Sequence, residues 1–421
     1  MLNVIDNNLF IENISFESLA EKYGTPCYVY SKASLVNEFK EYKDVFKDYA
    51  NTTICYSVKA NSNLSILNIF NSLGSGFDIV SEGELDRIKK IGADPNKVVF
   101  SGVAKSYEEI KKAIEFGICF FNVESFDELE QINRIAEEIG TKARISIRVN
   151  PDIDPKTHPY ISTGLKTSKF GIAIEDSYEA FKSAFKMKNI DVVGIDSHIG
   201  SQIFELKSFE DSLIRLEELY KKLTKIGINI RYIDIGGGLG IKYKDDEIPP
   251  AKIDFADKIK NIMKNINCNL VLEPGRSLVG NAGFLITKVL YNKTSNDKNF
   301  LIVDAGMNDI LRPSLYGAYH KVSKSIQSFE NEKIYDVVGP ICETGDVISY
   351  NTPLNDIRLG DNLIIHSAGA YGSVMSSNYN SRPKVCEVLV SGDDSYLIRK
   401  KETIGQILQN EVIVKWTNPL F

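Results

Sequence analysis

Between residues 52 and 283, short apolar runs alternate with segments of helical periodicity. The apolar runs are rich in Val, Ile, Phe and Tyr, as buried parallel strands are. Eight of them are expected to form strands, at residues 52–60, 76–81, 98–103, 119–125, 143–151, 192–200, 231–240 and 269–279. Eight strand–helix units over this length predict a closed α/β barrel of eight parallel strands. The alternation alone also fits an open, doubly wound sheet.

Two of the helical segments have clear boundary signals. Residues 82–93 follow Ser81, and Glu84 lies three residues after this cap, as in a capping box. Residues 207–227 carry leucines at helical spacing and end at Gly227. Helices between successive strands are the connections that a parallel sheet needs.

The pattern changes after about Gly283. Strand-like runs separated by turn residues follow, without comparable helices, at residues 284–290, 300–304, 335–340, 362–366, 384–390 and 395–400. Near the N-terminus, a helical stretch at residues 16–23 precedes a short strand at residues 26–31. We therefore predict two domains, which are a barrel at residues 32–283 and a mainly antiparallel β domain formed by residues 1–31 and 284–421.

Composition narrows the classes of function. The net charge of −6 gives no reason to expect nucleic-acid binding. No run reaches the roughly 18 apolar residues of a membrane span, and the N-terminus lacks the basic region of a signal peptide. The six cysteines occur singly, which predicts neither a metal site nor a disulfide framework and is typical of the reducing cytoplasm.

Arginine is scarce relative to lysine, because the chain contains 11 arginines and 39 lysines. A chain that uses lysine by default keeps arginine where the planar guanidinium matters, for example on a carboxylate. Arg148, Arg276 and Arg312 lie beside candidate motifs, whereas Arg87, Arg134 and Arg215 fit ordinary surface ion pairs.

Candidate chemistry gathers at the expected strand ends, where the active sites of parallel barrels lie. These ends carry Lys59, Ser81, Ser101, Asn122, Arg148, His198, Gly236–Gly238 and Glu273–Arg276. A lysine in such a place is positioned to form a Schiff base. A lone strand histidine is more often a hydrogen-bonded core residue, so only its neighbours make His198 a candidate.

A run of glycines at residues 236–240 follows the seventh expected strand. Consecutive glycines let backbone N–H groups close around a phosphate, and barrels often bind phosphate after strands seven and eight. A dinucleotide-binding motif is excluded by spacing, because Ile241 occupies the position of its last glycine. Without a ligand, the same run would be a tight turn.

Two further residues have side chains that suit acid–base chemistry. Glu273 is suited to hold a pyridinium nitrogen protonated, although with Arg276 it also fits an ordinary surface ion pair. Cys342 lies between turn residues of the β domain, and its thiol is suited to donate a proton to a carbanion. An isolated cysteine is more often a small apolar residue.

Taken together, these motifs resemble those of one family. The likeness is to the barrel-type pyridoxal-phosphate-dependent decarboxylases, whose barrel is alanine-racemase-like, and it runs in order through residues 56–61, 196–202, 236–240, 273–276, 342–343 and 368–372. Three further segments, at residues 158–164, 304–313 and 315–320, are similar to the branch of this family that acts on meso-diaminopimelate.

The resemblance implies a set of residue roles. Lys59 would bind pyridoxal 5'-phosphate as a Schiff base, Glu273 would keep its pyridine nitrogen protonated, His198 would stack on its ring, and Cys342 would protonate the substrate's α-carbon. Further expected cofactor contacts are Asp78, Arg148, Ser201, Gly237, Gly238, Gly275, Arg276 and Tyr371. Expected substrate contacts are Arg276, Arg312, Tyr316, Glu343 and Tyr371. No metal is expected.

The activity that the resemblance implies is decarboxylation of meso-2,6-diaminopimelate to L-lysine and CO₂, the last step of lysine biosynthesis. It also implies a homodimer with shared active sites, in which the cysteine segment comes from the partner subunit. Three alternatives stay open. One is a decarboxylase of ornithine, arginine or carboxynorspermidine, and another is a racemase, which would need a second base but not Cys342. The third is a catalytically silent pyridoxal-phosphate-binding regulator, which should have lost the lysine, the cysteine or the glycine run.

Overall fold

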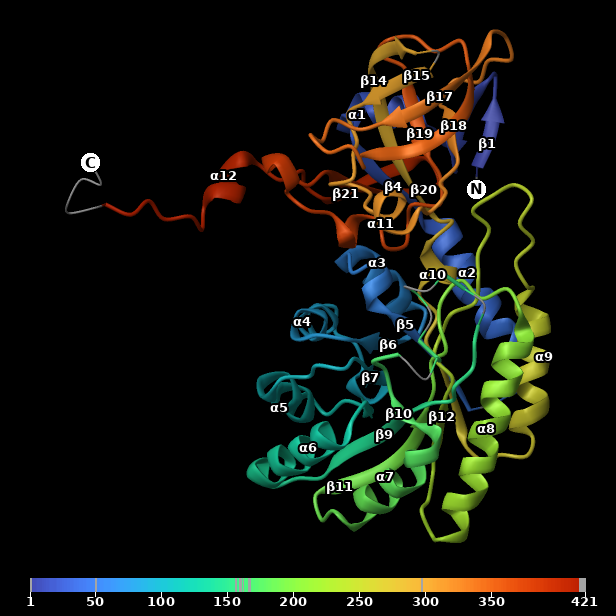
Figure 1. The fold of residues 1–421 in the computed structure, drawn as a ribbon, viewed down its shortest axis with the longest axis vertical. Coiled ribbons are helices and arrows are strands. Elements are labelled where there is room, and N and C mark those ends of the chain that lie inside the picture. Colours follow the sequence, from blue (N-terminus) through green and yellow to red (C-terminus); the bar gives the residue numbers. More distant parts are fainter. Residues whose placement is uncertain are drawn as a thin grey trace. The chain divides into compact units, whose positions relative to one another are not determined.

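The computed structural model describes residues 2–49, 51–155, 157–158, 161, 163–165, 168–296 and 298–415. Pro159, Tyr160 and Ser162 of the segment at 158–164 therefore lie outside the described residues. The described chain forms two compact units (Figure 1). The barrel unit contains Ser31–Gly283 and Gly369–Val374, and the β unit contains the described parts of residues 1–30, 284–368 and 375–421.

The barrel unit is a closed ring of eight parallel strands. These are β5 (Thr52–Ser57), β6 (Gly76–Ile79), β7 (Val98–Phe100), β8 (Phe120–Val123), β9 (Ala143–Asn150), β11 (Ile190–Asp196), β12 (Tyr232–Asp234) and β13 (Asn269–Leu272). Each strand pairs in parallel with the next, and β13 pairs with β5 to close the ring. The predicted closed barrel is therefore confirmed, and the open sheet is excluded.

Helices connect these strands, and Figure 1 shows α4 to α6 and α7 to α9 on the outer side of the ring. The helices of this unit are α2 (Lys32–Val45), α3 (Leu64–Ser72), α4 (Glu82–Lys90), α5 (Tyr107–Phe116), α6 (Phe126–Ile139), α7 (Ile174–Lys186), α8 (Leu206–Lys225), α9 (Lys252–Met263) and α10 (Arg276–Val279). A short strand, β10 (Ile172–Ala173), extends the pairing of β9. Among the described residues, no helix is long and apolar enough to span a membrane.

Local sequence explains how these helices begin, end and face the strands. In α6, Leu129, Ile132 and Ile135 recur at helical spacing and are all fully buried. Ser125 caps the start by accepting a hydrogen bond from the Glu128 N–H, and Gly140 ends the helix with a φ of 76°. The expected cap of α4 is also present, because the Ser81 hydroxyl accepts from the Glu84 N–H at 3.3 Å. The Glu84 carboxylate binds the Val80 N–H rather than that of Ser81, so only half of the capping box forms.

Several strands are shorter than the apolar runs predicted. The run at 269–279 ends as a strand at Leu272, and α10 occupies its last residues. The reason is Pro274 and Gly275, which interrupt the strand before the helix begins. The run at 231–240 forms a strand only to Asp234, because the glycines that follow leave the sheet. Polar and catalytic candidates therefore lie in the loops just beyond the strands.

The β unit is a sheet in the order β18-β17-β15-β14-β4-β20-β21, with β19 beside β14 and β16 beside β19. Its strands are β4 (Cys27–Ser31), β14 (Gly283–Ser295), β15 (Lys298–Val303), β16 (Val322–Lys324), β17 (Glu332–Val338), β18 (Val347–Asn355), β19 (Asn362–Ile365), β20 (Cys386–Ser391) and β21 (Asp394–Arg399). A small sheet is formed by β1 (Leu2–Ile5), β2 (Asn8–Ile11) and β3 (Ile14–Ser15). Its helices are α1 (Phe16–Tyr23), α11 (Arg312–Tyr316) and α12 (Ile404–Leu408).

This sheet is mainly antiparallel, as expected, although β15 and β17 pair in parallel. The sequence pattern missed β18, which contains Asn351 and Pro353, two residues that disfavour strands. The strand is tolerated because it lies at the edge of the sheet, where a missing N–H donor leaves no neighbour unpaired.

Residues 369–374 differ from the predicted domain division, because they belong to the barrel unit rather than to the β domain. Their backbone is tied to the barrel. The Tyr371 N–H donates to the Ala60 carbonyl at 2.8 Å, and the Gly369 N–H donates to the Gly280 carbonyl at 3.1 Å. A Cβ on Gly369 would lie 1.9 Å from the Val279 carbonyl oxygen, so only glycine permits this approach. The segment thereby brings Tyr371 to the barrel mouth.

Candidate active site

A narrow pocket opens at the C-terminal ends of the barrel strands, where the sequence placed the chemistry. It is lined by Ser57, Lys59, His198, Ser201, Gly238, Leu239, Glu273, Gly275, Arg276, Ser277 and Tyr371. The structure thus gathers eight of the expected site residues around one pocket, and Ser57, Leu239 and Ser277 join them. Strands adjacent in the ring explain the grouping, because β5, β13 and β12 are neighbours although they are far apart in the sequence.

Lys59 lies on a short 3₁₀ turn, Val58–Ala60, directly after β5. Its Nζ is 2.8 Å from Oδ2 of Asp78, and the Ser57 hydroxyl donates to the same oxygen at 2.6 Å. Burial by itself lowers the pKa of Lys59, but the negative charges of Asp78 and Glu273 outweigh it, so the pKa is raised overall. The lysine is therefore held as an ammonium group until a reacting carbonyl compound competes with Asp78 for it.

Glu273 follows β13 and is buried among hydrogen-bond donors. Its Oε1 lies 3.3 Å from Nδ2 of Asn122 and 3.4 Å from the hydroxyl of Ser101. Burial raises the pKa of Glu273 well above its usual range, and the charges of Asp234 and Asp78 raise it further. A protonated carboxyl in this place can share its proton with a basic ring nitrogen.

Arg148 lies near the end of β9, and other groups of the protein bind much of its guanidinium. It forms an ion pair with Glu124 at 2.7 Å and a longer one with Asp196 at 3.8 Å. It also donates to the His198 carbonyl at 3.4 Å and packs over the Phe170 ring at 4.8 Å. These contacts make Arg148 a residue that positions the backbone of His198.

His198 presents a neutral imidazole in the pocket. Burial lowers its pKa well below the usual value, and the charges of Arg148 and Lys59 lower it further. Its Nδ1 accepts a hydrogen bond from the Gly237 N–H at 3.2 Å, which fits the unprotonated state of that nitrogen. A flat, uncharged ring fixed in this way suits stacking on another aromatic ring.

The glycine run is closed in by neighbouring backbone, so no side chain fits there. A Cβ on Gly237 would lie 2.1 Å from the Glu273 carbonyl oxygen, and one on Gly238 would lie 2.3 Å from that of Gly200. Gly238 also has a φ of 112°, which other residues rarely adopt. The absence of side chains leaves a cradle whose backbone a phosphate can approach closely. The N–H groups of Gly236, Gly237 and Gly240 donate to Asp234, His198 and the Ile203 carbonyl, so they are not open donors of this cradle.

Arg276 begins α10 and lines the same pocket as Gly238. Its Nε and one terminal nitrogen donate to the Ser201 hydroxyl at 3.2 and 3.0 Å, and the other terminal nitrogen donates to the Tyr243 hydroxyl at 2.7 Å. The guanidinium also lies over the Tyr371 ring, with 5.0 Å between them. Sequence reasoning missed Tyr243, since nothing in its polar loop marks it.

The pocket fits a flat ring that carries a phosphate at one end and a basic nitrogen at the other. The glycine cradle and Arg276 supply the anion site, and Glu273 supplies the acid. Three buried oxygens nearby, Asp78 Oδ1, Asn122 Oδ1 and Asp196 Oδ1, have no hydrogen-bond partner among the described residues. Buried polar atoms without partners are rare in folded proteins, and they favour a polar group bound in this pocket.

The other expected residues lie in the β unit. Arg312 is buried at the start of α11, with its terminal nitrogen 2.8 Å from Nε2 of His320, whose Nδ1 lies 2.8 Å from the His366 carbonyl. Tyr316 is the last residue of the same helix. No local sequence pattern marks His320, because its contact with Arg312 arises only in the fold.

Cys342 and Glu343 occupy a turn of the β unit, and Cys342 is exposed there. The Cys342 N–H donates to Oδ1 of Asn380 at 2.7 Å, and the Tyr379 hydroxyl donates to the Glu343 carboxylate at 3.1 Å. Asn380 has a φ of 55°, an uncommon value for a residue other than glycine. The loop at 379–381 therefore shapes the cysteine turn, and sequence reasoning did not single it out.

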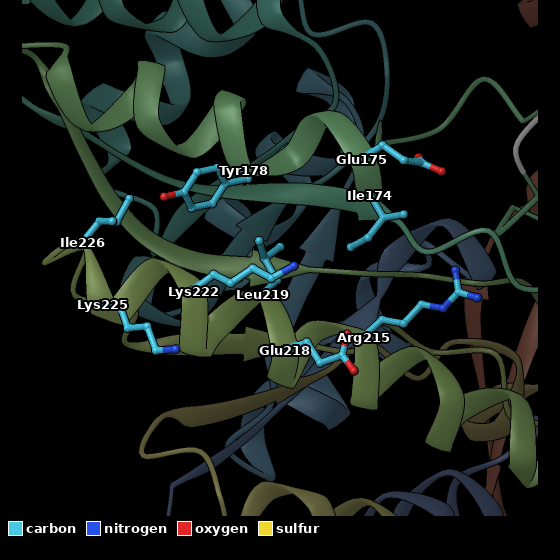
Figure 2. Close-up of a pocket in the computed structure, with 9 residues that line it drawn as sticks. All are labelled: Ile174, Glu175, Tyr178, Arg215, Glu218, Leu219, Lys222, Lys225 and Ile226. Atoms are coloured by element: carbon cyan, nitrogen blue, oxygen red, sulfur yellow. The ribbon is translucent and has the colours of Figure 1, made fainter.

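A wider groove, of about 780 Å³, lies on the outside of the barrel between α7 and α8. Figure 2 shows Ile174, Glu175 and Tyr178 of α7 facing residues of α8. Glu218 and Lys222 are one helical turn apart there, which is the spacing of an ordinary solvated helix face. We assign the active site to the barrel mouth instead, because a lysine, a neutral histidine and a buried acid with shifted pKa values line one pocket there.

The chain is similar over most of its length to proteins of one known family. The family model described as "Pyridoxal-dependent decarboxylase, pyridoxal binding domain" matches residues 32–280. The diaminopimelate decarboxylase of Aquifex aeolicus is 47% identical over 405 residues, covering 96% of each chain. That of Haemophilus influenzae is 50% identical over 403 residues, covering 95% of this chain and 96% of the relative. The crystal structure of the Helicobacter pylori diaminopimelate decarboxylase complexed with L-lysine is 44% identical, with a TM-score of 0.90 over 94% of this chain and 98% of that chain.

The first prediction concerns the glycine cradle. Gly237→Ala should weaken binding of pyridoxal phosphate about 10- to 100-fold, because overpacking of about 1–3 kcal/mol would push the cradle away from Glu273. Equilibrium dialysis gives the dissociation constant, and thermal unfolding shows whether the fold survives. Gly83→Ala is the matched control, since its Cβ would lie 4.0 Å from the nearest atom, and it should leave binding unchanged. Equal binding by the two variants would contradict the assigned cradle.

Proposed function

The chain belongs to the pyridoxal-dependent decarboxylases, and we propose that it converts meso-2,6-diaminopimelate to L-lysine and CO₂, the last step of lysine biosynthesis. The observation that carries this proposal is the barrel-mouth pocket, in which Lys59, the acid Glu273 and a phosphate cradle meet. The choice of substrate in this proposal rests on the similarity to diaminopimelate decarboxylases over nearly the full chain.

Bound pyridoxal phosphate supplies an aldehyde that condenses with amines and a pyridine ring that accepts the electron pair left when CO₂ departs. The chain's own residues hold it for that task. Lys59 would supply the amine, Glu273 would keep a proton at the ring nitrogen, and the neutral ring of His198 would stack on the cofactor ring. The glycine cradle, Ser201, Gly275 and Arg276 surround the phosphate end, and Tyr371 lies beside Arg276.

The distal end of the substrate is assigned to the β unit. Arg312 offers a planar guanidinium that suits a carboxylate, and the contact with His320 fixes its orientation. Glu343, Tyr316 and Tyr371 are proposed to complete the contacts with the second carboxylate and the amino groups. Cys342 is proposed to return a proton to the α-carbon. Its exposed thiol is accessible for this role.

The assembly is proposed to be a homodimer with shared sites, in which the cysteine turn is donated by the partner subunit. The enzyme is proposed to work in the cytoplasm. Support comes from the six cysteines, all described and all free, of which five are buried. A reducing compartment keeps such thiols reduced.

The alternative functions are less well supported by the site. A racemase does not need Cys342 or Glu343, and a silent regulator does not need to keep Lys59, Glu273 and the glycine cradle together. Decarboxylases of ornithine or arginine act on substrates without a distal carboxylate, so a buried arginine such as Arg312 would have no carboxylate to bind.

The central test is CO₂ release from a panel of diamino acids by the purified protein loaded with pyridoxal phosphate. Diaminopimelate should be the best substrate, and each CO₂ should be matched by one L-lysine. Borohydride should label the peptide that contains Lys59, and Lys59→Ala should abolish both labelling and turnover. Lys97→Ala, at an exposed lysine before β7, is the control and should behave as wild type. Labelling of another lysine, or faster turnover of ornithine, would overturn the proposal.

A second test addresses Arg312. Arg312→Lys keeps the charge but loses the planar fork, so kcat/KM for diaminopimelate should fall about 10- to 100-fold, the effect of losing roughly 1.5–3 kcal/mol of charge-assisted hydrogen bonding. Slow turnover of diamino acids that lack the distal carboxylate should change much less. Arg358→Lys, at an exposed surface ion pair, is the control. An equal loss on both classes of substrate would show that Arg312 does not bind the distal carboxylate.

A third test addresses the shared site. Lys59→Ala and Cys342→Ala homodimers should each be nearly inactive. Mixing them under conditions of subunit exchange should restore about a quarter of normal activity, since half of the dimers become mixed and each mixed dimer keeps one intact site of two. No recovery despite proven exchange would place Cys342 in its own subunit's site or outside catalysis.

A further inference from the structure

Asp234 is a fully buried carboxyl group at the end of β12 that none of the roles above requires. Its Oδ1 accepts a hydrogen bond from the Gly236 N–H at 2.9 Å, at the start of the glycine cradle. Its other side faces Glu273, and a hydrogen bond between the two carboxyl groups raises the pKa of Glu273 and lowers that of Asp234, so Glu273 is the donor while it keeps its proton. Asp234 therefore connects the phosphate end of the pocket with the acid at its other end.

Asn122 links the same two carboxyl groups. Its Nδ2 lies 3.5 Å from Oδ2 of Asp234 and 3.3 Å from Oε1 of Glu273. The same nitrogen lies 3.1 Å from the Ser101 hydroxyl, so its two N–H groups are shared among three acceptors and cannot neutralise two negative charges. Two buried carboxylates side by side would repel each other strongly, so one of them must carry a proton.

The surrounding charges leave this pair without a cation of its own. The groups whose charges interact with this pair from neighbouring elements are Asp78 on β6, Arg148 on β9, Asp196 on β11, Lys59 after β5, and the Cys55 thiol on β5. Lys59 forms an ion pair with Asp78, and Arg148 forms ion pairs with Glu124 and Asp196. Among the described residues, no cation lies within ion-pair distance of Asp234 or Glu273. A proton is the remaining means of neutralisation.

We propose that Asp234 keeps a proton when Glu273 gives its own proton to the ring nitrogen of the cofactor, and that the hydrogen bond between them then reverses, with Asp234 as the donor, so that the pair carries one negative charge. In that transfer, the O–H bond of Glu273 breaks and an N–H bond forms at the ring. Asp234 is then a positioning residue, whose hydroxyl holds the Glu273 carboxylate while its other oxygen holds the cradle. The inference rests on pyridoxal phosphate as the cofactor.

The acidity of Asp234 fits this role. Burial raises the pKa of Asp234 to about 8, and the nearby charge of Asp196 adds to the rise. The group is therefore protonated at neutral pH and ionises as the pH rises through about 8. Ionisation would place two charges on the pair while Glu273 is a carboxylate. Cofactor affinity should accordingly be complete below that pH and fall above it.

The variant Asp234→Asn tests the ionisation of Asp234 while it keeps the shape of the side chain. Asparagine can still accept from the Gly236 N–H, and its amide donates permanently to Glu273, as the protonated acid does. The dissociation constant of pyridoxal phosphate is to be measured by equilibrium dialysis from pH 6.5 to 9.5, in steps of about half a pH unit. Above about pH 8, we expect it to rise in the wild type relative to Asp234→Asn. The ratio of the wild-type dissociation constant to that of Asp234→Asn should change about tenfold per pH unit, as one ionisation requires. Asp234→Leu loses both hydrogen bonds and should bind weakly at every pH.

Asp191→Asn is the matched control, because Asp191 is a partly exposed acid on β11 whose ion pair is with Arg231. It should keep the wild-type profile. Identical pH profiles of cofactor binding for wild type and Asp234→Asn would overturn the proposal. Equally weak binding by Asp234→Asn and Asp234→Leu would also overturn it, because the carboxylate itself would then be needed. The Asp234→Asn comparison stands even if Asp234→Leu fails to fold. Failure of wild type to bind pyridoxal phosphate at any pH would refute the proposed cofactor instead, so the two failures are distinguishable.

Discussion

The structure of the active site depends on one constraint, which is the burial of more acids than bases at the barrel mouth. Asp78, Glu124, Asp196, Asp234 and Glu273 are buried there beside the cations Lys59 and Arg148. A buried carboxylate must be paired, hydrogen-bonded or protonated, because its transfer from water is otherwise too costly. Asp78 forms an ion pair with Lys59, and Arg148 forms ion pairs with Glu124 and Asp196. Glu273 and Asp234 remain, and protonation of these two supplies the acid that a pyridine ring requires.

The barrel supplies this arrangement through its ring of strands. β5 and β13 pair in parallel, with Leu270 opposite Thr52 and Leu272 opposite Ile54, so both strands run toward the same end of the barrel. Lys59 and Glu273 meet for that reason, although they are far apart in the sequence. β12 pairs with β13 on the other side, which places the glycine cradle next to Glu273. The chemistry therefore follows from strand order and from glycines that allow two backbones to approach closely.

The sequence was sufficient to predict the barrel, the mainly antiparallel β sheet and a cluster of reactive residues at strand ends. Those predictions rest on local patterns, such as apolar periodicity, helix caps and glycine runs. Local patterns could not show that Tyr243 binds Arg276, that His320 orients Arg312 or that Asn380 holds the cysteine turn. Each of these contacts joins residues whose proximity depends on the completed fold. Residues 369–374 were placed in the wrong domain for the same reason, since their contacts with Ala60 and Gly280 leave no mark in the sequence apart from Gly369.

Arginine usage connects the sequence with the energetics of the site. All eleven arginines are described, and the buried ones are Arg148, Arg276 and Arg312, which are those beside the motifs. Each has directed partners: acids and a carbonyl for Arg148, two hydroxyl groups for Arg276 and an imidazole for Arg312. A lysine ammonium at these positions would be more strongly hydrated in water and could not present several N–H groups in one plane. The burial of a guanidinium is tolerable because those N–H groups find partners in fixed directions, and the same fixed directions are what a carboxylate or phosphate requires. A chain that otherwise prefers lysine therefore keeps arginine where burial and planar recognition coincide.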